Sequence, residues 1–168
     1  MTRHMQNIVI KGYHYDQEVY DKYTENEIFY LALNFTSNCN YKCPYCFVGQ
    51  HDLNTKADSD LTLEKIKALL VEARASGAKV LVVPGRGEPF LDKNFWSVVE
   101  YATSLEYWIV VYTNGSRLDV EKIQQIKQLP ISLYLKVDSF DKAIYEKMVG
   151  VERYGYWRRL SACCGKGL

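Results

Sequence analysis

The segment IFYLALNFTSNCNYKCPYCF, residues 28–47, joins an apolar run to a loop that contains three cysteines. The run Ile28–Phe35 is almost entirely aliphatic and aromatic, which predicts a β-strand buried on both faces. Directly after it, Cys39, Cys43 and Cys46 follow one another with the spacing C-x3-C-x2-C. A loop of this kind at a strand end places the chemistry of the protein at the carboxyl-terminal edge of a parallel α/β fold.

Helical and strand patterns alternate downstream of this segment. Apolar residues at helical spacing predict a helix over residues 62–76, with Thr62 as its N-cap and Gly77 as its stop. The same patterns predict strands at 79–83, 107–112 and 131–137, and helices at 93–104, from Asp119 onward, and at 141–149. Short turns between them indicate parallel strands joined by right-handed crossovers. A doubly wound sheet and a barrel both fit this order. Gly, Cys and polar clusters after each strand favour an α/β fold that is a partial (β/α) barrel of about four units.

Composition places the chain among soluble globular proteins. Hydrophobic residues make up 48% and charged residues 24%, which is too apolar for disorder, and 168 residues are enough for one sizeable domain. The formal net charge of +1 and the lack of a basic run give no indication of nucleic-acid or membrane binding. No apolar run has the length of a membrane span, and the first residues lack the apolar core of a secretory signal. We therefore expect a cytoplasmic protein, in which clustered cysteines stay reduced and indicate a metal or catalytic site.

The cysteine spacing suits an iron–sulfur cluster. Eight residues can wrap three thiolates around three corners of a cubane, whereas an all-cysteine cluster ordinarily has four protein ligands. One iron is then left open to bind and reduce a small molecule. Zinc is an alternative, because His51 follows Cys46 by five positions and completes a Cys3His set. A purely structural cysteine cluster is a third.

The loop resembles the signature of the radical S-adenosylmethionine (SAM) superfamily, in which C-x3-C-x2-C carries an aromatic residue, here Tyr45, before the last cysteine. The resemblance implies that Cys39, Cys43 and Cys46 hold a [4Fe–4S] cluster whose open iron chelates the amino and carboxylate groups of SAM. One electron from the cluster then cleaves the sulfonium and yields a 5′-deoxyadenosyl radical, which abstracts a hydrogen atom. It also implies that Tyr45 lies beside the adenine.

The turn after the second predicted strand is similar to the superfamily's Gly-Gly-Glu turn, whose polar groups meet the SAM amino group. This chain reads Gly85-Arg86-Gly87-Glu88-Pro89, so that Arg86 replaces the first glycine of the trio and a glycine stands one position earlier. Gly87 still allows the backbone to approach a ligand closely, and Glu88 offers an acceptor for an ammonium group. Pro89 fixes the turn before Asp92, a candidate helix cap. In isolation this turn would be an ordinary βα connection with a surface glutamate.

Two further strand ends carry polar residues. Thr113-Asn114-Gly115 is by itself a common turn, but the resemblance makes Thr113 and Asn114 candidates for the SAM pocket. Lys136 and Asp138 flank Val137 at the end of the fourth strand, where the superfamily often places residues that meet the ribose hydroxyls or the SAM carboxylate. The alternative for this pair is a solvated ion pair.

The resemblance spans roughly residues 28–149. We divide the chain into a lead-in at 1–27, a partial radical SAM barrel at 28–160 and a tail at 161–168. Radical SAM barrels typically have about six βα units and this chain supplies four, so we expect the strand at 131–137 to be an edge. Such an edge favours self-association, or a partner chain that completes the barrel.

The predicted function is therefore reductive cleavage of SAM for hydrogen abstraction from a peptide or small-molecule substrate. The implied electron donor is a flavodoxin- or ferredoxin-like protein. Some peptide-modifying members carry an additional cysteine-rich domain, for which the adjacent Cys163 and Cys164 cannot substitute. Two alternatives remain open: a non-catalytic zinc-binding or iron–sulfur electron-transfer module, and a truncated, inactive fragment of a radical SAM enzyme.

Overall fold

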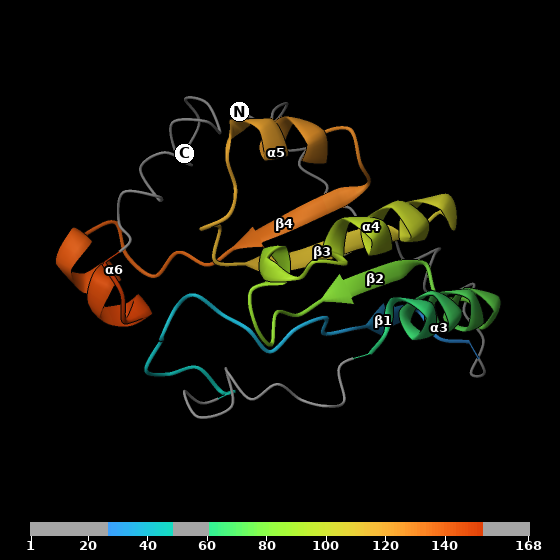
Figure 1. Cartoon of the computed structure of the whole chain (residues 1–168), viewed down its shortest axis with the longest axis horizontal. Helices are drawn as coiled ribbons and strands as arrows, with labels where there is room; N and C mark the ends of the chain where they lie inside the picture. The colour runs from blue at the N-terminus through green and yellow to red at the C-terminus, as the bar shows by residue number, and fades with distance from the viewer. Residues whose placement is uncertain (1–26, 49–60, 153–168) are drawn as a thin grey trace, which may run out of the picture.

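The computed structural model of the protein describes residues 27–48 and 61–152 (Figure 1). Three predicted features lie outside the described residues: the lead-in except for its last position, His51, and the tail with Cys163 and Cys164. No described helix has the length and apolar character that crossing a membrane would require.

Strands and helices alternate along the described chain, as the sequence predicts. In chain order the elements are β1 (Tyr30–Ala32), α3 (Leu63–Ala75), β2 (Val80–Val83), the 3-10 helix η1 (Pro89–Leu91), α4 (Phe95–Ser104), β3 (Trp108–Thr113), α5 (Val120–Ile126), β4 (Ile131–Leu135) and α6 (Lys142–Val149). The four strands pair in parallel in the order β1-β2-β3-β4. In a doubly wound sheet the order of the strands reverses at a switch point. Here neighbouring strands follow one another in sequence, which is the order found in the wall of a barrel. The fold is thus a partial (β/α) barrel, as predicted.

Local capping explains where several helices begin. The Thr62 hydroxyl accepts a hydrogen bond from the Lys65 N–H at 3.3 Å, and Asp119 and Asp141 act in the same way at the starts of α5 and α6. The prediction that Asp92 caps α4 is wrong in detail, because Asn94 is the N-cap residue. Asp92 instead accepts from the Asn94 N–H at 2.7 Å, since η1 intervenes between the turn and the helix.

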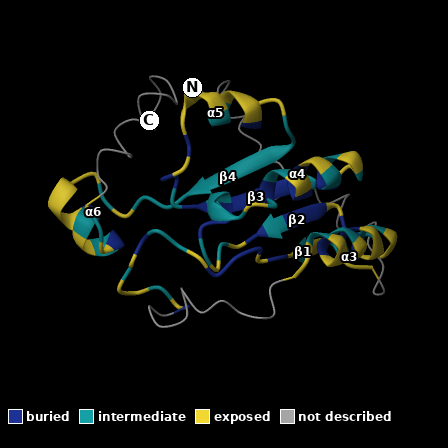
Figure 2. Ribbon diagram, viewed as in Figure 1, coloured by how far each residue is buried: buried dark blue, intermediate teal, exposed yellow. Residues whose placement is uncertain are grey.

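The main core lies between the sheet and the helices that cover it (Figure 2). Leu70 of α3, Val98 of α4 and Ile109 of β3 are fully buried there. The expectation that the first strand is buried on both faces is wrong, because Tyr30 is 58% exposed. Within the described residues, β1 lies at an edge of the sheet with β2 as its partner, so this part of the chain does not give it the cover that a central strand receives.

Helix α6 lies beyond the carboxyl ends of the strands, beside the cysteine loop (Figure 1). Its residues Tyr145 and Val149 form a second small core with Tyr41 of that loop. The hydroxyl groups of Tyr41 and Tyr145 lie 3.2 Å apart, and the Lys42 N–H donates to the Val149 carbonyl at 2.9 Å. Helix α6 therefore packs on the loop that carries the cysteines.

Strand β4 is at the other edge of the described sheet, as predicted, and it ends at Leu135, two residues earlier than expected. Lys136 and Asp138 consequently stand on the segment that leaves the strand. Association through the β4 edge stays a prediction.

Candidate active site

A cavity of about 430 Å³ opens at the carboxyl ends of the strands. This volume is within the range of pockets that take small molecules and cofactors. Nine of the ten predicted site residues line it: Cys39, Cys43, Tyr45, Cys46, Gly87, Glu88, Thr113, Asn114 and Lys136. The tenth, Asp138, contacts two of these nine. The fold thus brings together residues that lie about 100 positions apart in the sequence.

The three cysteines are free thiols of intermediate exposure. A turn in which the Cys46 N–H donates to the Cys43 carbonyl at 3.1 Å holds the last two together. The Cys39 sulfur accepts from the Tyr41 N–H at 3.4 Å. Burial raises the pKa of Cys39 and of Cys43, and the Tyr41 N–H and the Lys136 ammonium, respectively, offset part of that rise. These two thiols therefore hold their protons more tightly than free cysteine until a cation displaces them.

The donor set fits a cluster better than a single ion. Within the described residues, no three His, Cys, Asp or Glu side chains converge closely enough to hold one metal ion. A cubane attaches each thiolate to a different iron, so its ligands need not converge on one point. The three free thiols line the same cavity and have the chemistry that such a cluster requires.

Glu88 is buried beneath the rim, at 1% exposure. Its Oε1 accepts from the Thr113 hydroxyl at 2.6 Å and the Phe90 N–H at 3.3 Å, and its Oε2 accepts from the Asn114 N–H at 2.8 Å. Burial raises the pKa of this carboxyl, although the three hydrogen bonds oppose the rise. A carboxylate has about four acceptor positions, so one remains on Oε2. Glu88 is thus a brace between the second and third strand ends that retains one free acceptor.

Gly87 allows the turn after β2 to press against the cysteine loop. A Cβ atom at this position would come within 2.3 Å of the Asn38 carbonyl oxygen. In the structure the next residue, Glu88, donates its N–H to that same oxygen at 2.8 Å. The second glycine of the Gly-Arg-Gly-Glu turn is therefore explained by a backbone contact with the residue before Cys39, and no ligand is needed to account for it.

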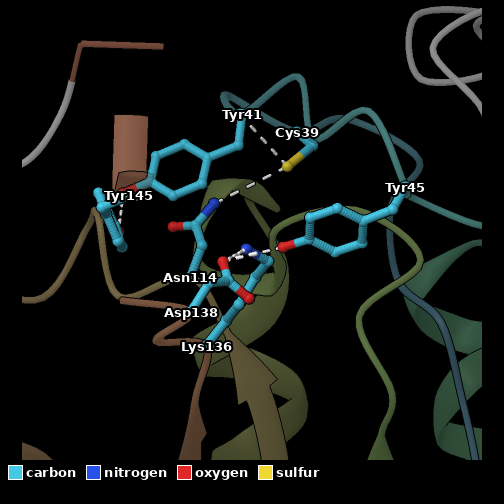
Figure 3. Close-up of polar contacts among 7 residues, drawn as sticks. All are labelled: Cys39, Tyr41, Tyr45, Asn114, Lys136, Asp138 and Tyr145. Carbon is cyan, nitrogen blue, oxygen red and sulfur yellow. Dashed lines mark hydrogen bonds and ion pairs between the residues drawn. The ribbon is translucent and has the colours of Figure 1, made fainter. Parts of the chain in front are cut away.

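Tyr45, Lys136 and Asp138 form a cluster of polar contacts (Figure 3), and the first two of them line the cavity. The Tyr45 hydroxyl donates to Asp138 Oδ2 at 2.8 Å, and the Lys136 ammonium forms an ion pair with the same oxygen. Lys136 Nζ also lies 5.0 Å from the centre of the Tyr45 ring, a cation–π distance. Burial lowers the pKa of Lys136, but the hydrogen bonds with Asp138 and Tyr45 outweigh it and raise the pKa overall. The Lys136–Asp138 ion pair is therefore bound to the cysteine loop through Tyr45, unlike a freely solvated ion pair.

Asn114 reaches across the cavity floor to the cysteine loop (Figure 3). Its side-chain nitrogen lies 3.0 Å from Asn40 Oδ1 and 3.8 Å from the Cys39 sulfur. Asn40 in turn donates to the Ser116 hydroxyl at 2.8 Å. Sequence reasoning missed Asn40 and Ser116, although both stand within two residues of a recognised motif.

An aromatic pair on the cavity wall was also missed. Tyr112 of β3 and Tyr134 of β4 are register partners whose rings stack with centroids 4.9 Å apart. Strand alternation contained a signal, because Tyr112 is offset by two from the inward-facing Asn114. Arg86, which replaces the first glycine of the superfamily's turn, also lines the cavity.

Comparison with known families matches residues 33–163, most of the chain, to the Radical SAM superfamily. Among curated relatives, a GTP 3′,8-cyclase of Haemophilus influenzae (strain PittGG) is 30% identical over 153 residues, which are 89% of this chain and 44% of the relative. An Fe-coproporphyrin III synthase of Methanosarcina barkeri (strain Fusaro / DSM 804) is 30% identical over 61% of this chain and 25% of its own length. The chain thus spans less than half the length of these relatives.

Solved structures share the fold. Streptococcus suis SuiB bound to S-adenosylmethionine superposes with a TM-score of 0.68 and 16% identity over 82% of this chain and 31% of SuiB. Native anSMEcpe with bound AdoMet gives a TM-score of 0.64 and 19% identity, over 80% of this chain and 39% of that one. At this level of identity the likeness concerns the fold alone.

Proposed function

Because the chain belongs to the radical SAM superfamily, we propose that it takes part in the reductive cleavage of SAM and in hydrogen abstraction from a bound substrate. Members of this superfamily use a [4Fe–4S] cluster and SAM as cofactors. When bound, the cluster supplies the electron that cleaves SAM to a 5′-deoxyadenosyl radical. The observation that carries the proposal is the assembly of nine predicted residues from four strand ends around one cavity.

Cys39, Cys43 and Cys46 are the proposed cluster ligands. Three ligands leave one iron free for SAM, and the adjoining cavity gives SAM a place to lie beside it. Since burial raises the pKa of Cys39 and Cys43, cluster loading must release protons from these thiols. The ammonium of Lys136 assists by favouring the thiolate of Cys43.

We assign the other residues to SAM by charge and position. The free acceptor on Glu88 Oε2 suits the SAM amino group, and the Lys136 ammonium suits its carboxylate. Asp138 suits a ribose hydroxyl, and the half-exposed ring of Tyr45 suits the adenine face. Thr113 and Asn114 hold Glu88 in place, while Gly87 keeps the rim closed against the cysteine loop.

A small-molecule substrate is favoured over a peptide. The curated relatives with about 30% identity are named as a cyclase of GTP and a synthase of Fe-coproporphyrin III, whereas SuiB bound to the precursor peptide SuiA shares 18% identity and so only a fold. The stacked pair Tyr112 and Tyr134 gives the cavity an aromatic wall that suits a planar ring. A flavodoxin- or ferredoxin-like protein is the proposed electron donor.

Anaerobic reconstitution with iron and sulfide tests the proposal. We expect a brown protein with iron and sulfide near 4:4 that forms 5′-deoxyadenosine from SAM and a strong reductant. Alanine at Cys39, Cys43 or Cys46 should abolish the absorbance near about 400 nm or leave a damaged cluster, because each supplies one of three ligands. Full iron in the triple variant would refute the assignment, and stoichiometric zinc after anaerobic expression would favour the non-catalytic alternative.

A further inference from the structure

The Cys39 sulfur has a side-chain neighbour whose role the SAM pocket does not explain. The Asn114 side-chain nitrogen lies 3.8 Å from it, within reach of an N–H···S contact because sulfur is larger than oxygen. The backbone N–H of Tyr41 donates to the same sulfur at 3.4 Å. Cys39 thus lies between a donor of its own loop and a donor from the end of β3 (Figure 3).

The surroundings of Asn114 determine which end of its amide faces the sulfur. The backbone N–H of Ser116 points at the side-chain oxygen at 2.9 Å, and a backbone N–H can only donate. That position must therefore be occupied by Oδ1, which directs the NH2 group toward Cys39 and toward Asn40 Oδ1, 3.0 Å away. A flipped amide would set two donors against each other at Ser116 and two acceptors against each other at Asn40.

The main chain of Asn114 is held as firmly as its side chain. Its N–H donates to the buried Glu88 carboxylate at 2.8 Å, and the Glu88 N–H bonds to the carbonyl of Asn38, next to Cys39. Glu88 therefore fixes the distance between the cysteine loop and the end of β3. The amide of Asn114 is thus oriented before any cofactor binds.

Resting on the proposed function, we propose that Asn114 tunes the cluster by donating an N–H···S hydrogen bond to the Cys39 ligand. A donor on a ligand sulfur withdraws negative charge, and the reduced cluster carries one more negative charge than the oxidised cluster. The bond is therefore stronger in the reduced state and raises the midpoint potential, since hydrogen bonds to the sulfurs are among the factors that set it. The side chain of Asn114 thus affects the midpoint potential of the cluster, whereas its main-chain N–H holds Glu88.

Asn114→Ser is the informative substitution. A serine hydroxyl can still accept from the Ser116 N–H, as Thr113 accepts from the Gly115 N–H at 3.0 Å, but it is too short to reach Cys39. Asn114→Asp keeps the shape and the acceptor while it replaces the donor by negative charge. The matched control is Asn94→Ser, because Asn94 begins α4 away from the cavity and makes no side-chain capping bond.

The measurement is the midpoint potential of the reconstituted full chain, by redox titration without SAM and followed by electron paramagnetic resonance. At a fixed poise, Asn114→Ser should reduce the ratio of reduced to oxidised cluster about tenfold, which is about 59 mV for a one-electron couple. Asn114→Asp should lower the potential further, and Asn94→Ser should leave it unchanged. Iron and sulfide content is measured for every variant.

Asn114→Ser with full cluster content and the wild-type potential would overturn the inference. Loss of the cluster in both Asn114 variants would overturn it as well, because Asn114 would then serve assembly and not potential. A wild-type chain that binds no cluster would instead refute the proposed function. The two failures are therefore distinguishable.

Discussion

Replacing Glu88 by glutamine separates the two roles that the structure gives this residue. The carboxylate braces the rim through three hydrogen bonds and retains one acceptor position on Oε2. Glutamine can preserve most of the brace. Its carbonyl oxygen can accept from the Asn114 N–H, and its NH2 group can donate to the Thr113 hydroxyl oxygen. What it loses is the charge, the bond to the Phe90 N–H and the acceptor of the Thr113 hydroxyl proton.

We therefore expect Glu88→Gln to weaken SAM binding and to leave cluster assembly nearly unchanged. A charge-assisted hydrogen bond to an ammonium group in a partly dry cavity contributes on the order of 1.5–3 kcal/mol, so SAM affinity should fall about 10- to 150-fold. The free energy of unfolding should change by no more than about 1–2 kcal/mol, the contribution of one or two neutral hydrogen bonds. Cluster content should remain close to that of the wild type.

Anaerobic equilibrium dialysis of SAM against the reconstituted chain measures SAM affinity, urea unfolding measures the free energy of unfolding, and iron and sulfide analysis measures cluster content. Glu88→Ala is the contrasting variant, because it leaves three donors without their acceptor. At about 1–3 kcal/mol for each buried unsatisfied group, it should destabilise the rim by at least about 3 kcal/mol. Glu100→Gln, on the exposed side of α4, is the control for the chemical change. Unchanged SAM affinity in Glu88→Gln would refute the assignment and leave Glu88 as a brace alone.

Two further predictions concern stability. Gly150→Ala should lower the free energy of unfolding by more than about 2 kcal/mol and accelerate iron loss to a chelator. The reason is that Gly150 has a left-handed φ of 67° and that a Cβ there would lie 2.2 Å from the Lys42 carbonyl oxygen. An unchanged rate of iron loss would contradict this prediction. The second prediction follows from burial, which raises the pKa of Glu88 above its ordinary 4.5. Its contribution to stability is fully present below that value and is lost as the pH rises through the folded-state pKa. Urea unfolding between about pH 4 and about pH 8 should show wild type losing stability relative to Glu88→Gln, and a constant difference would count against it.

Features that depend on neighbours in sequence were predictable. Thr62, Asp119 and Asp141 cap helices through residues three positions away, so the helix starts follow from local chemistry. The cysteine spacing and the glycine-rich turn are equally local. Their meeting at one cavity followed from one topological fact, that parallel strands present their carboxyl ends at the same edge.

Features that depend on distant segments were not predictable. The burial of Glu88 requires Thr113, 25 residues away, and the packing of α6 on the loop requires Tyr41 to meet Tyr145, 104 residues away. Neither contact produces a periodic pattern in the sequence, because each involves a single side chain from each segment and not the whole face of a helix or strand. The exposure of Tyr30 is similar, since whether a strand lies at a sheet edge depends on its partners and not on its own composition.

The cysteine loop is fixed from three sides, and this bears on how it would take up a cluster. The Glu88 N–H holds Asn38, the Val149 carbonyl holds Lys42, and Asn114 contacts Cys39 from the end of β3. Ordering a free backbone costs about 1–2 kcal/mol per residue, so a loop ordered by its protein neighbours brings its thiols to the cluster at a smaller entropic cost. Two of these contacts are backbone hydrogen bonds at positions where Gly87 or Gly150 lets the chains approach. Gly87 and Gly150 therefore keep the cysteine loop in place, whether or not they touch a ligand.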